Sequence, residues 1–383
     1  ALNVLLILGS VLACWLAMEL VFPRLLPRLP RHVFQHMVRE LRLLGQTSKA
    51  GLLPGPGYLA IAGDSYAQGK GDWFADTGYN LDSRYQATHL LQERLGQDVV
   101  SFGRSGAGSV DGLLVEPLQT LRFLRRLGLE IADPAVMLVY FYEGNDLHNN
   151  LDLLEDHFPG SPEQALRDAA GFDAFLRGLV AAYADGRPRE PRERPLFGNF
   201  VLRGLRDTLR AKVLRRTVDV EPVAKAGEVN AVRVAGRVVA VPDRLQSPPL
   251  EMAEAGRALG LYVFAHALTL AREVYPSTRL VVVYVPSPLS CYTLASAEVS
   301  TYYGGERRFP AERVAEESDR LYAAVHRISE DQTLPCVDAR PALREVAREA
   351  LIHGPRDWDH LNRRGYEALT RALLAAVSAG GGT

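Results

Sequence analysis

Cysteine is scarce in this chain, which has 383 residues and only three cysteines, Cys14, Cys291 and Cys336. Three cysteines cannot form the disulfide framework that holds many small secreted domains together. We expect Cys291 and Cys336 to be two separate buried thiols, with a single bridge between them as the alternative.

An excess of charge of either sign is also missing. The 44 basic and 45 acidic side chains give a formal net charge of -1. Nucleic-acid binding requires a concentrated basic surface, so we expect no nucleic-acid partner. The composition, 47% hydrophobic and 23% charged, is typical of a globular protein, and the length allows one elaborated domain or two smaller ones.

Several common catalytic and cofactor motifs are absent as well. The chain has no GxSxG nucleophile elbow, no Walker A loop and no HExxH zinc motif. The stretch GPGYLA at 55–60 imitates a dinucleotide fingerprint, but it precedes an apolar run, whereas the fingerprint follows a strand. We therefore expect neither a cofactor nor a metal ion.

A long apolar run opens the chain. Residues 1–22 (ALNVLLILGSVLACWLAMELVF) carry one charge, on Glu19. About 20 apolar residues are enough to cross a bilayer as a helix, so we interpret this segment as a transmembrane anchor. A core helix would normally show a polar stripe, and a cleaved signal peptide a basic start and an A-x-A site; these are the alternatives.

Residues 23–50 are rich in arginine, with apolar residues at helical spacing from Val33 to Leu44. This pattern predicts an amphipathic membrane-surface helix or linker. Arginines directly after a span favour a cytoplasmic location for the domain that follows.

From residue 55 on, short apolar runs alternate with helical stretches. This alternation predicts an α/β fold with a parallel sheet and helices on both faces, formed by residues 55–146 and 249–380. In such sheets ligands bind beyond the carboxyl ends of the strands. The predicted strands are 58–63, 98–103, 135–142, 279–286 and 334–339, and the predicted helices are 84–95, 111–127, 250–274 and 310–329.

Residues 147–248 interrupt this alternation. We expect two helices, 162–182 and 199–216, followed by a β-hairpin in NAVRVAGRVVAVPD (230–243). The insertion is either a cap over the active edge or a subdomain that packs on the periphery.

Ser65 stands in the stretch IAGDSYAQGKGDW (61–73), directly after the first predicted strand. Gly, Asp and Ser are turn formers, so the stretch is an ordinary turn unless other groups support a nucleophile. A serine nucleophile needs a base, an acid that orients the base, and donors to an oxyanion. Asp357 and His360 are three residues apart before the last helical stretch, where their side chains can share a face and supply acid and base.

Two further stretches supply candidate oxyanion donors. Asn145, in EGND at the end of the third predicted strand, can aim its amide beyond the sheet edge. Gly106 lies on the glycine-rich loop SFGRSGAGS (101–109) after the second strand, and such a loop can present backbone N–H groups to an anion. Each stretch alone is also a common turn, but all four lie at the carboxyl edge of the predicted sheet, where one site can collect them.

Taken as a set, these stretches resemble the SGNH (GDSL-type) hydrolase superfamily over residues 58–145 and 279–375. The resemblance implies a flavodoxin-like three-layer sandwich with a parallel sheet. The asparagine usual at the start of the second block is Ser101 here. The residues to which the resemblance assigns roles are Ser65 (nucleophile), His360 (base), Asp357 (acid) and, as the oxyanion hole, Ser65, Gly106 and Asn145.

The resemblance also implies a membrane-anchored bacterial enzyme that acts on ester bonds. It would be a hydrolase when water takes the acyl group, or an O-acyl(acetyl)transferase when a sugar hydroxyl does. The expected substrate is an acylated envelope polysaccharide or lipid, the expected partners are the bilayer and other membrane subunits, and the expected location is the periplasmic side of the inner membrane. Tyr66, Trp73 and Phe74 are candidates for stacking on a sugar or, equally, for core packing. The alternative is a catalytically idle scaffold subunit of a membrane complex.

Overall fold

A five-stranded parallel sheet is the centre of the computed structural model, which describes residues 2–34, 39–74, 77, 82–187, 197–199, 201–202 and 227–378. The order β10-β6-β3-β1-β2 places the strands, numbered along the chain, in the order 2-1-3-4-5, which is the flavodoxin-like arrangement. The strands are β1 (Leu59–Ala62), β2 (Val99–Ser101), β3 (Val136–Tyr142), β6 (Arg279–Val285) and β10 (Cys336–Asp338).

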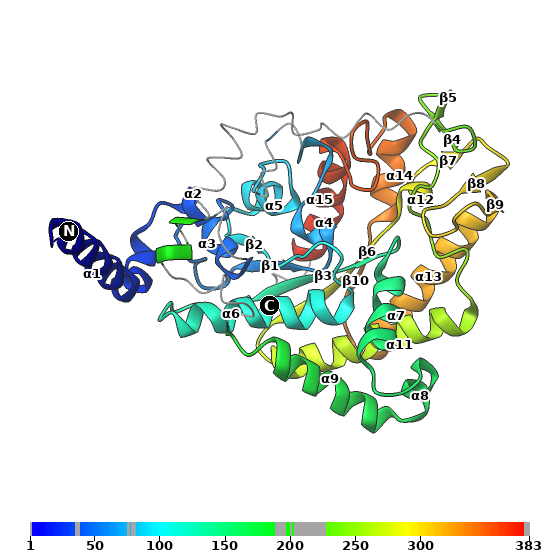
Figure 1. Ribbon diagram of the computed structural model, residues 1–383. Coiled ribbons are helices and arrows are strands. Elements are labelled where there is room, and N and C mark those ends of the chain that lie inside the picture. The colour runs from blue at the N-terminus through cyan, green and yellow to red at the C-terminus, as the bar shows by residue number, and fades with distance from the viewer. Residues whose placement is uncertain are drawn as a thin grey trace.

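Alternate side chains of each strand enter two hydrophobic cores, one on each face of the sheet. In β6, Val282 and Tyr284 belong to one core and Val281 and Val283 to the other. Such strands read as continuous apolar runs because both of their faces are buried. The helices that cover the first core are α6 (Glu116–Arg126) and α11 (Glu254–Val274), and those that cover the second are α5 (Ala87–Leu95), α14 (Arg340–Glu349) and α15 (Arg363–Ser378) (Figure 1). The three-layer sandwich predicted from the sequence is confirmed.

The insertion after β3 begins with a helix that the sequence analysis did not predict, α7 (Asp146–His157). The helix predicted over 162–182 is divided into α8 (Pro162–Arg167) and α9 (Ala169–Tyr183). Phe172 of α9 packs against Tyr262 of α11, with ring centroids 5.1 Å apart. This part of the insertion therefore packs on the outside of the helical layer. The helix predicted over 199–216 lies almost entirely outside the described residues.

The hairpin predicted over 230–243 is confirmed as β4 (Ala231–Val234) and β5 (Arg237–Ala240). Its turn residues Ala235 and Gly236 have φ values of 49° and 73°. Two-residue hairpin turns of this kind need positive φ at both positions. The hairpin pairs with β7 (Thr293–Leu294), and a second small sheet is formed by β8 (Glu298–Ser300) and β9 (Arg308–Pro310).

Helix α1 (Leu2–Leu25) extends away from the body of the molecule (Figure 1). Together with η1 (Leu26–Arg28) it is the one segment of the described chain that is long and apolar enough to cross a membrane. Its most apolar window has a mean hydropathy of 2.3 and is 0% buried, and a signal sequence would pass the same test. The rings of Trp15 and Phe22 lie 5.3 and 5.8 Å from that of Phe197.

The segment after α1 differs from the single membrane-surface helix that its sequence suggests. It forms three short pieces, α2 (Arg31–Phe34), η2 (Arg39–Leu41) and α3 (Arg42–Gly45), and residues 35–38 lie outside the described chain. Phe34, Leu43 and Leu44 are buried in the first core. These apolar side chains therefore contact protein and are not available to a membrane surface.

The three cysteines are free: Cys14 is exposed, Cys291 is buried and Cys336 is partly buried. Cys291 follows β6 and Cys336 begins β10, and both thiols are separate, as expected. Burial raises the pKa of the Cys336 thiol to about 11, so it stays protonated at neutral pH.

A buried carboxylate ties the carboxyl end of β3 to three neighbouring elements. Glu143 accepts hydrogen bonds from the hydroxyls of Tyr284 (2.5 Å), Ser287 (2.5 Å), Ser318 (2.6 Å) and Ser290. These partners belong to β6, to the start of α12 (Pro288–Cys291) and to α13 (Glu312–Asp331). Since Glu143 comes two residues before Asn145, the network fixes the strand end that carries the candidate oxyanion donor.

We expect Glu143→Ala to lower the free energy of unfolding by about 3–5 kcal/mol, because the substitution leaves several buried hydroxyls without an acceptor. Urea unfolding of the full chain followed by circular dichroism measures the loss. Glu345→Ala, on the exposed face of α14, is the matched control and should change the stability by less than about 0.5 kcal/mol. Equal stability of the two variants would show that the network contributes nothing.

Candidate active site

Ser65 lies at the carboxyl edge of the sheet, where β1 turns into the short helix α4 (Ser65–Gln68). Asp64 caps this helix, since its Oδ1 accepts the backbone N–H of Tyr66 at 2.9 Å. Gly63 has φ 142°, and a Cβ there would lie 3.0 Å from Tyr140, so the turn requires glycine. The sequence thus places Ser65 at the first position of a helix, with only 5% of its surface exposed.

His360 and Asp357 are hydrogen-bonded to each other in the loop before α15. The distance from His360 Nδ1 to Asp357 Oδ2 is 2.6 Å, and Asp357 Oδ1 accepts the backbone N–H groups of Asp359 and His360. Asp72 in turn accepts the backbone N–H groups of residues 356 and 357, which fixes the loop. An ionised carboxylate can only accept, so Nδ1 donates and Nε2 is left with its lone pair. This is the tautomer that a general base needs.

Tyrosines fasten this loop to the Ser65 segment. Tyr66 donates its hydroxyl to the carbonyl of Asp359 at 2.8 Å, and its ring lies 5.5 Å from that of His360. Tyr366 donates to the carbonyls of Tyr66 and Lys70. The Ser65 hydroxyl itself donates to Asp64 Oδ2 at 3.3 Å, a long bond, and no hydrogen bond to His360 is formed among the described residues. The structure therefore brings the serine and histidine segments together without joining the two side chains.

The electrostatics of the pair favour a charged imidazolium. Burial alone would lower the pKa of His360, but the charge and hydrogen bond of Asp357, together with Asp359 and Asp64, raise it above its ordinary value. Burial likewise works to raise the pKa of Asp357, yet His360 and the two backbone N–H groups hold it below its ordinary value. A proton arriving on His360 is therefore stabilised, which is what a base needs in the transition state.

Two more carboxyl groups are buried beside this pair. Burial raises the pKa of Asp64, although the N–H of Tyr66 and the charge of His360 oppose the shift. Burial raises the pKa of Asp146 well above its ordinary value, and the charge of Asp64 adds to the effect. Because each carboxylate disfavours the charge of the other, the two groups resist being ionised together.

The candidate oxyanion donors face the same edge from two other elements. Asn145 occupies the N-cap position of α7 without a side-chain capping bond, and it is buried, with no hydrogen-bond partner for its Oδ1 in the described part of the chain. Gly106, with φ 72°, is exposed in the loop after β2 and lines a cavity of about 180 Å³. Asn150 joins the two elements: it accepts the N–H of Ser109 at 2.8 Å and donates to its hydroxyl at 2.9 Å.

Sequence reasoning missed Asn150, although the pair of asparagines in LHNN (147–150), directly after EGND, was a visible signal. An asparagine in a helix is unremarkable until its partner is known. Its amide also donates to the carbonyl of Gly260 in α11, so it fixes α7 on both sides.

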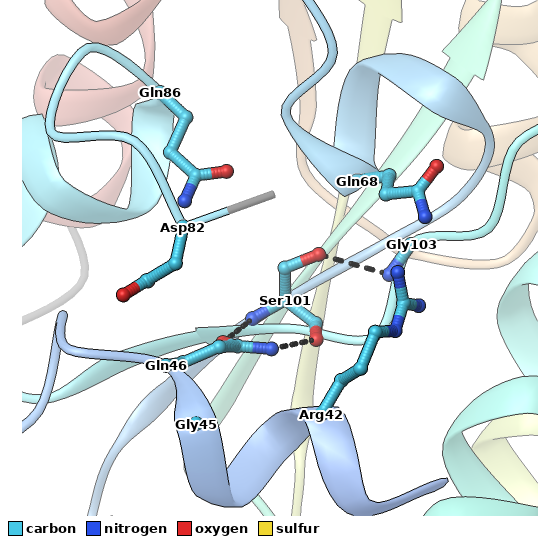
Figure 2. Close-up of a pocket in the computed structure, with 8 residues that line it drawn as sticks. All are labelled: Arg42, Gly45, Gln46, Gln68, Asp82, Gln86, Ser101 and Gly103. Atoms are coloured by element: carbon cyan, nitrogen blue, oxygen red, sulfur yellow. Dashed lines mark hydrogen bonds between the residues drawn. The ribbon is translucent and has the colours of Figure 1, made fainter. Parts of the chain in front are cut away.

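Ser101 forms two side-chain hydrogen bonds at the turn that follows β2. Its hydroxyl accepts the N–H of Gly103 at 3.0 Å and donates to the carbonyl of Ala67 at 2.6 Å. The side-chain amide of Gln46 forms two hydrogen bonds of 2.8 Å with the backbone C=O and N–H of Ser101 (Figure 2). The cavity beside these residues, about 30 Å³, has room for one water molecule and not for a substrate.

Two of the three aromatic residues near Ser65 in sequence, Tyr66 and Trp73, belong to the core, and Phe74 is partly buried. Tyr66 and Trp73 are buried and contact Tyr366, with centroids 6.5 and 5.0 Å apart. The interpretation of these two rings as sugar-stacking groups is wrong, because neither has a face open to solvent.

Comparisons with known proteins give distant likenesses in structure. An extracellular lipase from Streptomyces rimosus is 12% identical over 83% of this chain and 98% of that chain, with a TM-score of 0.41. A phospholipase A1 from Streptomyces albidoflavus NA297 is 14% identical over 84% and 99%, with a TM-score of 0.38. A carbohydrate acetylesterase family member from Sinorhizobium meliloti is 13% identical over 84% and 97%, with a TM-score of 0.33. No protein-family model and no curated protein matches the chain. These likenesses carry no argument about activity.

The pKa of His360 should fall in the variant Asp357→Asn, because the substitution removes the charge that outweighs burial. Titration of the histidine ring signals by NMR, assigned with a His360→Gln variant, measures the shift. In any reaction that uses His360 as a base, the acidic limb of the kcat/KM profile should move to lower pH in the same variant, since the base acts only when neutral.

Asp359→Asn is the control for this shift. Asp359 raises the pKa of His360 less than Asp357 does, so the control should move the titration in the same direction by less. An unchanged titration in Asp357→Asn would mean that Asp357 does not set the protonation state of His360.

Proposed function

We propose that the chain is a serine-dependent acyl-ester hydrolase or O-acyl(acetyl)transferase of the SGNH type. The observation that carries the proposal is the hydrogen bond between His360 and Asp357, held beside the helix start at which Ser65 lies. Acid, base and nucleophile come from both ends of the chain and reach one edge of the sheet. The candidate donors Asn145 and Gly106 come from the two strands that flank β1.

The reaction begins when the Ser65 hydroxyl turns from Asp64 to Nε2 of His360. Catalytic hydrogen bonds are often loose before substrate binds, and a rotation about one side-chain bond is a small change. Ser65 Oγ then forms a bond to the ester carbonyl carbon while its proton passes to Nε2, and Asp357 stabilises the imidazolium. The carbonyl oxygen becomes an oxyanion that accepts from the N–H groups of Ser65 and Gly106 and from the amide of Asn145.

The tetrahedral intermediate collapses by breaking the ester C–O bond. The departing alkoxide takes the proton from His360, which leaves the acyl group on Ser65. A second hydroxyl, activated by the same imidazole, then attacks the acyl-serine and releases the product. Water as this acceptor makes the protein an esterase, and a sugar hydroxyl makes it an O-acyltransferase.

A catalytically idle scaffold remains the second candidate, because the Ser65 hydroxyl donates to Asp64 and not to His360 in the structure. Such a scaffold would keep the buried Asp357–His360 pair as a structural link only. Turnover of an ester substrate distinguishes the enzyme from the idle scaffold.

We expect Ser65→Ala to lower kcat for p-nitrophenyl acetate by at least about 10³-fold, since the acyl group then has no oxygen to bond to. Asn145→Ala should cost about 10²–10³-fold in kcat, as for one lost oxyanion donor. Ser105→Ala, an exposed serine on the glycine-rich loop, is the matched control and should retain full activity. Wild-type turnover that persists in Ser65→Ala would remove Ser65 from the mechanism, and a folded wild type with no turnover would favour the scaffold.

We also propose that α1 is a single-pass anchor in a bacterial inner membrane, with the catalytic domain in the periplasm. The support is the exposed apolar surface of α1, on which Leu5, Leu12 and Leu20 are 66%, 59% and 74% exposed. The arginines that follow α1 would favour a cytoplasmic location of the domain. Arg31, however, donates hydrogen bonds to the carbonyls of Lys49 and Ala50 and so has a structural role in the fold.

A fusion of alkaline phosphatase to the C-terminus should be enzymatically active, because that enzyme folds only in an oxidising compartment. A fusion of green fluorescent protein at the same site is the reciprocal control and should stay dark. Bright fluorescence with an inactive phosphatase would place the domain in the cytoplasm.

A further inference from the structure

An exposed pair of aromatic rings lies on the segment between β8 and β9. Tyr302 is 48% exposed and Tyr303 is 38% exposed, and their rings meet edge to face with centroids 5.0 Å apart. One face of Tyr303 lies parallel to the ring of His148, at 3.7 Å and 10°. His148 is itself fixed by Glu251, since its Nε2 lies 2.7 Å from Glu251 Oε1. One face of the Tyr303 ring is therefore covered by His148, and both tyrosine rings remain partly exposed to solvent.

This aromatic pair stands next to the candidate active site. His148, which supports Tyr303, is on the first turn of α7, directly after Asn145. Burial, followed by Tyr302 and the carboxylates of Asp152, Glu251 and Asp359, raises the pKa of Tyr303 to about 12. Tyr303 therefore contacts the element of the proposed oxyanion donor through His148, and the charge of Asp359, the residue before His360, also acts on it.

A series of hydrogen bonds and ring contacts links the aromatic pair to His360. Tyr302 donates its N–H to the carbonyl of Leu245 at 2.9 Å, and Gln246 binds the hydroxyl of Tyr142. Tyr142 packs on Tyr66, with ring centroids 4.3 Å apart, and Tyr66 contacts His360. The aromatic pair therefore has a fixed place relative to the catalytic loop.

A polar cavity of about 180 Å³ runs from Gly106 along α7, and Asp152 in its lining is one of the carboxylates that act on Tyr303. Pockets for drug-sized ligands exceed roughly 300 Å³, so this space suits one small unit. Its described lining residues include Asp111, Asp152, Asp156 and two asparagines, but no lysine or arginine. Asp111 is paired with Arg104, while Asp152 and Asp156 have no ion-pair partner among the described residues.

We propose that this surface, formed by Tyr302 and Tyr303 and by the cavity beside Gly106, binds the saccharide part of an uncharged O-acylated sugar. The inference rests on the proposed function and names its substrate class. The C–H face of a sugar ring packs on an aromatic ring, and sugar hydroxyls donate to carboxylates. A phospholipid fits worse, because its phosphate would meet the carboxylates of the cavity with no lysine or arginine among the described lining residues to compensate.

The test compares three substrates with the full-length protein in detergent: an O-acetylated cello-oligosaccharide, p-nitrophenyl acetate and vesicles of dioleoylphosphatidylcholine. Tyr303→Ala should raise KM for the sugar ester by about fivefold to tenfold, the value of one stacking contact, and leave p-nitrophenyl acetate turnover unchanged. Tyr303→Phe should behave as wild type. Leu166→Ala, an exposed apolar side chain on α8, is the matched control.

Binding of the deacetylated oligosaccharide to Ser65→Ala, measured by saturation-transfer NMR, separates this inference from the proposed function. Binding that requires Tyr303, in a protein without esterase activity, would support the saccharide surface and contradict the reaction. Turnover of p-nitrophenyl acetate without saccharide binding would overturn the surface alone. An equal loss on all substrates in Tyr303→Ala, or a preference for the vesicles that depends on Tyr303, would also overturn it.

Discussion

The hydrogen bond from His360 to Asp357 is the interaction on which the rest of the site depends. Its length of 2.6 Å, the two backbone N–H groups on the same carboxylate and the support from Asp72 fix the imidazole before any substrate arrives. Because the side chains of His360 and Asp357 are only 14% and 25% exposed, solvent screens their charges less than at the open surface, so an imidazolium formed there is stabilised more than an exposed one. A loop near the end of the chain thereby holds an oriented imidazole beside a helix near its start.

Burial of polar groups at the carboxyl edge of the sheet costs stability, and hydrogen bonds to specific partners offset this cost. Glu143 has four hydroxyl donors, and Asn150 is satisfied on both sides. Asn145 Oδ1 and Asp146 Oδ1, in contrast, have no partner within the described chain. Unsatisfied groups of this kind are expensive and collect where a ligand completes them. Both orphaned atoms are acceptors, so a ligand N–H or O–H group, and not an oxyanion, would complete them.

The sheet, its flanking helices, the position of Ser65 directly after β1 and that of His360 before the last helix follow from the sequence, because buried parallel strands leave continuous apolar runs. Helix α7 was missed since it begins directly at the EGND turn, whose polar residues suggest a loop. No local sequence pattern marks Tyr303 as part of a binding surface. Its ring is held by His148, which lies far away in the chain, so only the tertiary contact shows the arrangement. The prediction that Tyr66 and Trp73 stack on a sugar was wrong for the same reason. Proximity to Ser65 in the sequence does not reveal which way a ring points.

The central claim is that His360 activates the hydroxyl of Ser65. Labelling of the full-length protein with a fluorophosphonate, followed by peptide mapping by mass spectrometry, tests it most directly. The account predicts one adduct, on the oxygen of Ser65, and a labelling rate that falls sharply in His360→Gln. A folded protein that is not labelled at Ser65, or that is labelled equally fast without the imidazole, would contradict it.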